Sequence, residues 1–295
     1  MIKLMQIIIN FIIFLITLFV YIHINFHLKV TNDLEIYEAD ELTKDKLEEI
    51  CDIKQPLLFK YYVDVIHNEY KMENILSNYK TFDINIRNQE DYKNSDINIL
   101  PLSLKESKEL FDKDMSGSYI SEFNGDFISE TTLVKNNKSN DLFLRPYLCS
   151  DCNYDIILGS TNSYTPLKYE LNYRNFLYVI EGEAEIMITI PQNVKYLDII
   201  EDYDNFEFRS RLNPFNIGDR DKLEKVKFLT VILKPGDILY IPFKWLYTIR
   251  LKTKDTVLCK HNYKVVMNTL AILPQLIYNF LHNQNIKFNF LNTIK

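Results

Sequence analysis

The sequence predicts a mainly β domain with flanking helices, preceded by an N-terminal transmembrane helix. Three observations lead to this prediction. Residues 4–28 contain no Asp, Glu, Lys or Arg. Helical and extended patterns alternate over residues 43–114. From residue 141 onward, short apolar runs bounded by turn residues follow one another closely, and this spacing is typical of a β-sandwich or barrel.

The N-terminal apolar segment is long enough to cross a membrane. Its centre, residues 7–22, is interrupted only by Asn10 and Thr17, and a bilayer-spanning helix needs about 20 apolar residues. No small-residue pair follows at which a signal peptide would be cut. A cleaved signal or a buried core helix are the alternatives. We expect an uncleaved signal anchor over residues 1–30 and a single domain over residues 31–295.

The charges beside this segment favour a cytoplasmic N-terminus. Lys3 precedes the segment, whereas Lys29 and then acidic residues from Asp33 onward follow it. The positive-inside rule therefore predicts a single-pass membrane protein whose body lies on the lumenal or exterior side. On that side Asn137, in the sequon Asn137-Lys138-Ser139, would qualify as a glycosylation site.

The overall composition allows a substantial core and disfavours one class of partner. Hydrophobic residues make up 47% of the chain, and its formal net charge is −6. No Lys/Arg-rich block stands out, whereas nucleic-acid-binding proteins usually carry a basic patch. We therefore expect no nucleic-acid partner.

The cysteines leave several interpretations open. Cys149 and Cys152 form a CxxC, while Cys51 and Cys259 stand alone. A zinc site would need a second pair or histidines nearby, and neither is near in the sequence. Ordinary thiols are the simplest interpretation. A disulfide between Cys149 and Cys152 is the alternative if the body is lumenal, and metal or redox use is a third.

Up to residue 127 the patterns predict short helices and strands. Residues 31–41 are polar and acidic, and we interpret them as a stalk or first edge segment. Helices are expected over 43–53, 70–79 and 101–114, with Thr43 and Ser103 near the first and last starts. Strands are expected over 55–63 and 81–88. Residues 117–127 are expected to be irregular or extended.

Two later segments interrupt the run of strands. A polar and aromatic insertion lies between Gln192 and Lys227, and its Tyr- and Phe-rich part, residues 196–215, either covers the barrel mouth or contacts a partner. Residues 265–281 are apolar and helical in pattern, with Pro274 as an interruption. A packing or dimer helix is preferred here over a second membrane span.

Three stretches resemble parts of a known family. NYRNFLYVIEGEAEIMITIP (172–191) resembles the first core motif of the JmjC-like cupins, which include Fe(II)/2-oxoglutarate hydroxylases, and LKPGDILYIPFKWLYTIRL (233–251) resembles the second. QPLLFKYY resembles their opening strand. The resemblance covers roughly residues 36–290. It implies a double-stranded β-helix, a cupin or jelly-roll barrel with its core at about 141–262 and a C-terminal helix at about 264–283. The pattern also looks like a divergent cupin-like subgroup that includes uncharacterised proteins of large DNA viruses.

The resemblance also assigns site positions. Active members bind iron through a His-x-Asp/Glu pair on one strand and a distant His. Residues i and i+2 of a strand share a face, so such a pair can hold one cation, and the facial triad leaves positions open for cosubstrate. The pair falls on Lys168 and Glu170, and the distant His on Tyr247. A lysine that holds 2-oxoglutarate falls on Glu183, and Thr165 is the one matching cosubstrate position.

The departures from the family pattern predict a degenerate site. Protonated Lys168 cannot ligate Fe(II), the phenol of Tyr247 has a reference pKa of about 10, and Glu183 would repel a dicarboxylate. We therefore expect no catalytic residue, no metal ligand and no cofactor, with Thr165, Lys168, Glu170, Glu183 and Tyr247 as vestigial pocket positions. The five histidines lie outside both motifs: His23, His27, His67, His261 and His282. A relocated site built from His261 and Glu170 is the alternative.

Local hypotheses follow for the neighbouring residues. The Lys168 ammonium would take the place of the metal and pair with Glu170, with the Tyr247 hydroxyl donating to the same carboxylate, because a buried charge is costly unless paired. Alternatively, Lys168 extends to solvent. Trp245 is expected to pack in the core, and Arg174 with Asn175 to form structural hydrogen bonds.

Together these observations predict a membrane-anchored binding or scaffold module that contacts the membrane through residues 4–28 and has an unknown protein partner. A homodimer through the C-terminal helix is expected from related hydroxylases. The alternative is a Fe(II)/2-oxoglutarate-dependent protein hydroxylase with a rebuilt metal site. A structural protein of a membrane or envelope is the third interpretation.

Overall fold

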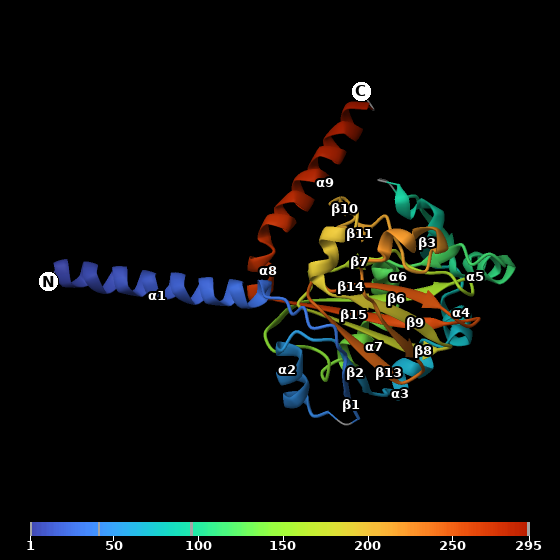
Figure 1. Ribbon diagram of the computed structural model, residues 1–295, viewed down its shortest axis with the longest axis horizontal. Coiled ribbons are helices and arrows are strands. Elements are labelled where there is room, and N and C mark those ends of the chain that lie inside the picture. Colours follow the sequence, from blue (N-terminus) through green and yellow to red (C-terminus); the bar gives the residue numbers. More distant parts are fainter. Residues whose placement is uncertain (1, 41, 95–96, 294–295) are drawn as a thin grey trace.

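The computed structural model describes residues 2–40, 42–94 and 97–293, and its body is built around two β-sheets packed face to face (Figure 1). Over these residues the larger sheet has the strand order β1 (Tyr37–Ala39), β2 (Leu57–Lys60), β13 (Asp237–Pro242), β8 (Arg174–Glu181), β15 (Val257–Val265), β6 (Cys149–Gly159), β5 (Tyr119–Ser121), β3 (Asp83–Asn88) and β4 (Ile99–Ser103). The smaller sheet has the order β10 (Ile199–Asp202), β11 (Glu207–Ser210), β7 (Lys168–Tyr169), β14 (Leu246–Leu251), β9 (Ala184–Thr189) and β12 (Leu229–Leu233). The mainly β fold class is confirmed.

Alternation along the central strands separates two cores. Side chains of a strand point in turn to opposite faces. On β8, Leu177 and Val179 therefore face the smaller sheet, whereas Phe176 and Tyr178 lie in the core on the outer face of the larger sheet. Trp245 belongs to the core between the sheets and is fully buried, as predicted.

Helices cover the outer face of the larger sheet: α2 (Lys44–Asp52), α3 (Asp64–Glu69), α4 (Met72–Tyr79), α5 (Leu104–Lys113), α6 (Gly125–Glu130) and α7 (Leu133–Asn140). The predicted starts of two of them are confirmed. Thr43 accepts from the Lys46 amide, and Ser103 forms a reciprocal capping box with Glu106. Short 3₁₀ turns complete the body: η1 (Gln89–Lys93), η2 (Pro191–Tyr196), η3 (Ile217–Asp219) and η4 (Asp221–Leu223).

The segment before the central strands differs from the prediction. Residues 117–127 were expected to be irregular or extended, and β5 agrees with this, but α6 begins within them at Gly125. The polar run that follows forms α7. Asn137 lies in α7 with only 1% of its surface exposed, and its amide donates to the Tyr70 hydroxyl at 2.7 Å. Because this side chain is inside the folded protein, the sequon is not an accessible glycosylation site there.

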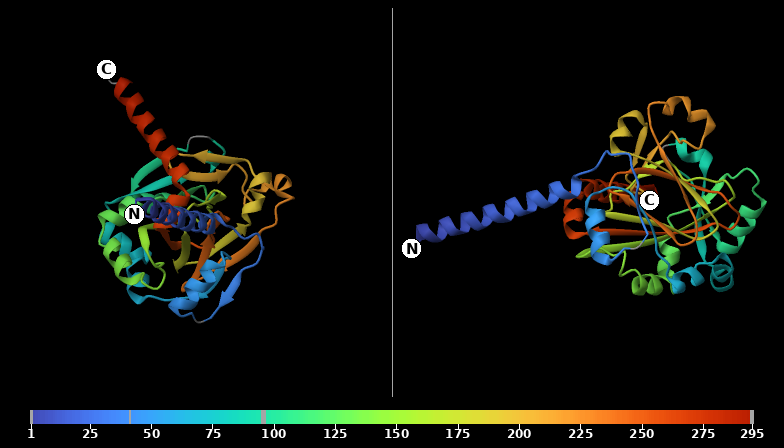
Figure 2. Two further views of the ribbon diagram at one scale, coloured as in Figure 1. Left: turned by 90° about the vertical axis from the view of Figure 1, so that its left-hand side faces the viewer. Right: turned by 60° about the horizontal axis from the view of Figure 1, so that its bottom comes forward.

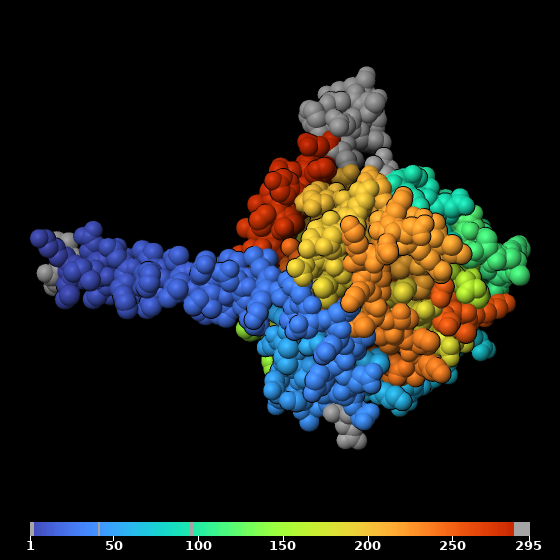
Figure 3. Space-filling view, in the orientation of Figure 1, coloured from blue at the N-terminus to red at the C-terminus, as the bar shows by residue number. Residues whose placement is uncertain are grey.

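Two helices project from the body in different directions (Figures 1 and 2). The first, α1 (Ile2–Leu28), is long and apolar enough to cross a membrane, and Figure 3 shows it as a rod outside the globular part. Its C-terminal end joins the body, where His27 packs its ring 4.9 Å from that of Tyr173. The second projecting helix is α9 (Leu273–Thr293), which follows α8 (Val266–Ala271). The two helices are separated at Ile272, just before Pro274, where the sequence predicted an interruption.

The insertion at residues 196–215 takes one of its two predicted roles. It forms the β10–β11 hairpin, and β11 pairs with β7 so that Arg209 lies opposite Lys168. Asn205 and Phe206, at its turn, line a cavity between the sheets. The hairpin therefore covers the open end of the sandwich, while a partner contact stays a prediction.

Candidate functional site

Strand register brings three of the five predicted site positions together. Lys168 on β7 lies opposite Tyr247 on β14, and Glu170 follows two residues later in the chain. The Tyr247 hydroxyl donates to a Glu170 carboxylate oxygen at 2.8 Å, so this part of the hypothesis is confirmed. Tyr247 is buried, and burial together with Glu170 raises its pKa well above the usual value.

The Lys168 ammonium is held by a different set of carboxylates from the one predicted. Its Nζ forms ion pairs with Glu122, just after β5, and with Glu207 on β11, the latter at 3.3 Å. It also lies 4.6 Å from the centre of the Phe123 ring. Lys168 is only 2% exposed, which excludes an extension to solvent.

Arginine side chains complete a buried charge cluster around Lys168. Arg87 on β3 contacts both Glu122 and Glu207, and Arg209 binds Glu207 and Asp202. We call Arg87, Glu122, Lys168, Asp202, Glu207 and Arg209 the inner charge cluster. Its cations and carboxylates balance when all are ionised, which is the arrangement that buried charges require.

The electrostatics keep Lys168 and Glu207 ionised at neutral pH. Burial disfavours the charged form of Lys168, but Glu122 and Glu207 outweigh it and raise the lysine pKa. Burial likewise disfavours the charged Glu207, but Arg87 and Lys168 outweigh it and lower its pKa to about 2. Neither Lys168 nor Glu207 therefore exchanges a proton near pH 7.

Glu170 takes its cation from another strand. Lys260 on β15, itself 4% exposed, forms an ion pair with the Glu170 carboxylate, and Asn172 donates to its other oxygen at 3.0 Å. Burial is outweighed by Lys260 and Lys168, so the pKa of Glu170 is lowered. The predicted Lys168–Glu170 pair is therefore wrong, because carboxylates from a distant loop and the β10–β11 hairpin lie closer to Lys168.

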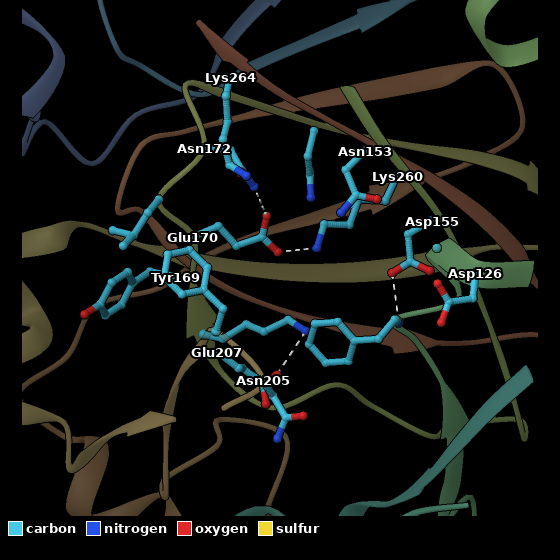
Figure 4. A pocket seen from close by; sticks show the side chains of 16 residues that line it. Asp126, Asn153, Asp155, Tyr169, Glu170, Asn172, Asn205, Glu207, Lys260 and Lys264 are labelled. Atoms are coloured by element: carbon cyan, nitrogen blue, oxygen red, sulfur yellow. Dashed lines mark hydrogen bonds and ion pairs between the residues drawn. The ribbon is translucent and has the colours of Figure 1, made fainter. Parts of the chain in front are cut away.

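A polar cavity of about 270 Å³ is bordered by five of the residues described above: Lys168, Glu170, Asn172, Glu207 and Lys260 (Figure 4). Lys260 and Asn172 reach Glu170 from different sides in this view. Amide and aromatic side chains also line the cavity, among them Asn153, Asn205, Asn262, Phe123, Tyr169 and Phe206, as do the charged side chains of Asp126, Asp155 and Lys264. In the described part of the chain, the buried Oδ1 of Asn262 has no hydrogen-bond donor.

The remaining predicted positions lie outside this cavity. The Thr165 hydroxyl accepts from the Ile249 amide at 3.0 Å and ties two segments of the smaller sheet together. Glu183 lies after β8, with 38% of its side chain exposed, 3.5 Å from Lys234. Arg174 and Asn175 have the structural roles predicted for them, bonding to Glu48 and to the Ile241 carbonyl.

A relocated site with His261 and Glu170 is excluded by strand alternation. Lys260 and His261 are neighbours on β15 and therefore face opposite sides of the sheet. His261 packs behind the larger sheet, where Tyr178 lies 2.8 Å from its Nε2 and Tyr263 lies 3.3 Å from its Nδ1. Burial lowers the pKa of this histidine to about 3, so it is neutral at pH 7.

The sandwich and its site can be assigned to a protein family. A family model described as a cupin-like domain matches residues 47–269, from α2 through both sheets to α8. The chain belongs to the cupin-like domain family. This confirms the cupin and JmjC-like relationship inferred from the two motifs. No curated protein matches the chain.

The donor set of this cupin-like domain does not fit Fe(II). A non-haem iron site needs imidazole and carboxylate ligands with open positions, whereas Glu170 is already bonded to Lys260, Tyr247 and Asn172. Within the described ranges, no cluster of His, Cys, Asp and Glu is placed to hold a metal ion. Glu183, acidic and half exposed, does not fit the carboxylate of 2-oxoglutarate either.

Sequence reasoning missed most of the residues that surround Lys168 and Glu170. Arg87, Glu122, Glu207, Arg209 and Lys260 come from four segments that the two motifs do not include or do not mark. One signal was present: Glu207 and Arg209 lie on either side of Phe208 on β11, and Lys260 interrupts the apolar start of β15. Charged residues at inward positions of apolar strands indicate a buried ionic network in a cupin-like domain.

Proposed function

We propose that this protein is a membrane-anchored, JmjC-related cupin that has lost Fe(II)/2-oxoglutarate chemistry and acts as a binding or scaffold module. One observation carries the proposal. The buried ammonium of Lys168 lies between Glu122 and Glu207, at the position where the family resemblance places a metal-binding histidine.

The energetics of this cluster oppose metal binding. A divalent cation beside Glu170 would be close to the fixed charges of Lys168 and Lys260, and like charges repel strongly in a low-dielectric interior. Moving Lys168 aside would leave Glu122 and Glu207 short of a cation, and an unpaired buried charge costs several kcal/mol. The lysine therefore substitutes for a metal as the cation that holds the interior together.

The strand arrangement supports a double-stranded β-helix as the fold. Four of these strands, β6, β8, β13 and β15, lie in the larger sheet, and β7, β9, β12 and β14 lie in the smaller one. Along the chain they alternate between the sheets except from β9 to β12, where the chain stays in the smaller sheet through the β10–β11 hairpin. Such alternation is what a jelly-roll barrel requires. The apolar helix α1 supports anchoring in a membrane, with the body on the lumenal or exterior side if the flanking charges set its orientation.

Metal and cosubstrate binding test the proposal directly. The full-length protein, purified in detergent without chelator, would be analysed for transition metals and then titrated with 2-oxoglutarate by calorimetry under anaerobic conditions with added Fe(II). We expect far less than one metal per chain and no cosubstrate heat.

A Glu170→Gln variant is the matched control, because any iron site at the family position needs this carboxylate. Near-stoichiometric iron and cosubstrate heat that are both lost in Glu170→Gln would overturn the proposal and establish a hydroxylase with a rebuilt site. Metal that the variant retains is bound elsewhere and leaves the proposal standing.

A further inference from the structure

The CxxC of β6 lies on a bulge that brings its two sulfur atoms together. Residues three apart on a regular strand point to opposite faces. Here Cys149 pairs with Val265 and Asp151 with Lys264, so Ser150 is an extra residue in the ladder. A bulge of this kind re-aims the side chains beside it. The Sγ atoms of Cys149 and Cys152 are 3.5 Å apart as a result.

Access separates this pair from the other two thiols. Cys149 and Cys152 are partly exposed, whereas Cys51 and Cys259 are each 1% exposed in the core. A disulfide needs its sulfur atoms about 2.05 Å apart, so side-chain rotation has only about 1.5 Å to close.

The surroundings make the two thiols chemically unequal. The hydrogen bond between the two thiols has the largest influence on the pKa of Cys152. Burial opposes it and Arg145 supports it, and the pKa of Cys152 falls to about 7. The same hydrogen bond and burial raise the pKa of Cys149. The Cys149 thiol also donates to the Asp151 carbonyl at 3.3 Å, which favours its protonated form. Because the thiolate is the nucleophile in disulfide exchange, we assign Cys152 as the attacking group and Cys149 as the resolving one.

We propose that Cys149 and Cys152 form a reversible dithiol–disulfide pair that exchanges with a low-molecular-weight disulfide such as oxidised glutathione. The Cys152 thiolate attacks one glutathione sulfur, and the other glutathione leaves as a thiolate and takes up a proton. Cys149 then loses its proton and attacks the Cys152 sulfur, which releases the second glutathione. The protein loses two hydrogens, and one oxidised glutathione becomes two reduced molecules.

Redox equilibration of the full-length protein tests this inference. The protein in detergent would be incubated at a series of reduced-to-oxidised glutathione ratios, quenched with acid, denatured and alkylated, and its cysteine peptides analysed by mass spectrometry. We expect Cys149 and Cys152 to lose alkylation together as the buffer becomes oxidising, and to regain it with excess dithiothreitol. Cys51 and Cys259 serve as internal controls that stay alkylated.

Single variants test the assigned order of attack. Cys149→Ser should accumulate a mixed disulfide with glutathione at Cys152, whereas Cys152→Ser should react at least about tenfold more slowly at pH 7, because Cys149 is mostly a thiol. Full alkylation of Cys149 and Cys152 in the wild-type protein at the most oxidising ratio would overturn the inference. So would disulfides that form only between two molecules.

Discussion

The two faces of β15 carry polar groups of opposite kinds. Toward the smaller sheet, Lys260 joins Glu170 beside the inner charge cluster, where full charges compensate one another. Toward the helices, His261 is a neutral hydrogen-bonding group between Tyr178 and Tyr263. In the iron-binding proteins that the two motifs resemble, histidine is a metal ligand. In this chain His261 packs behind the larger sheet, whereas Lys168 and Lys260 lie between the two sheets. The strand face on which a residue lies, and not its residue type, therefore decides whether it takes part in the charge network or in neutral hydrogen bonds.

Removing the Lys168 ammonium should lower the free energy of unfolding more than any other change considered below. Lys168→Met keeps most of the side-chain volume but leaves Glu122 and Glu207 with the arginines alone. We expect the free energy of unfolding to fall by about 3–5 kcal/mol, the usual cost of breaking a buried ion pair from one side. Denaturant titration of the full-length protein in detergent measures this change.

Two further variants separate charge balance from simple loss of a side chain. Lys234→Met removes an exposed cation, 3.5 Å from Glu183, and should cost at most about 1 kcal/mol. Adding Glu122→Gln to Lys168→Met restores neutrality, so the double variant should lose less than the sum of the single variants. Equal effects of Lys168→Met and Lys234→Met would show that the inner charges do not stabilise the fold.

The Tyr247 hydroxyl should contribute less to the stability of the fold than the Lys168 ammonium, because Glu170 keeps two other partners when the hydroxyl is removed. Tyr247→Phe removes the 2.8 Å hydrogen bond but leaves Lys260 and Asn172 in place. We expect a loss of about 1.5–3 kcal/mol in unfolding free energy, as for hydrogen bonds to charged groups. The exposed Tyr37 provides the control: Tyr37→Phe should stay within about 0.5 kcal/mol of wild type. A similarly small change in Tyr247→Phe would contradict the assigned role.

From the sequence, the residues at the centre of the site could be predicted, but their ion-pair partners could not. Lys168, Glu170 and Tyr247 could be placed together because the motifs carry strand register within one sheet. The partners are separated from Lys168 by 46 residues for Glu122 and 39 for Glu207, and Lys260 is 90 residues from Glu170. Alternation shows which face a charge occupies, but pairing across two sheets depends on the closed fold.

Local signals explain which elements were predictable. The helices α2 and α5 combine caps with buried apolar positions such as Leu47 and Phe111, so both were recognised. In contrast, α7 reads as a polar run, since Leu133 is one of its few apolar anchors. It is helical because the body packs against it and buries Asn137. Tertiary packing thus overrides weak helix propensity.

The buried neutral His261 on β15 should make the free energy of unfolding depend on pH. The pKa of His261 is about 3 in the folded protein, against an ordinary value of 6.5. Between these values the unfolded chain binds a proton that the folded protein does not, so stability falls as pH is lowered from 6.5 toward 3. His261→Gln, which cannot titrate, should lack this slope of up to about 1.4 kcal/mol per pH unit. Unfolding free energies of wild type and variant from pH 7.5 to 4.5 measure the difference, with His282→Gln, at an exposed histidine, as the control variant. Parallel curves for all three proteins would mean that His261 is not held neutral, and the contrast between the two faces would then rest on the lysines alone.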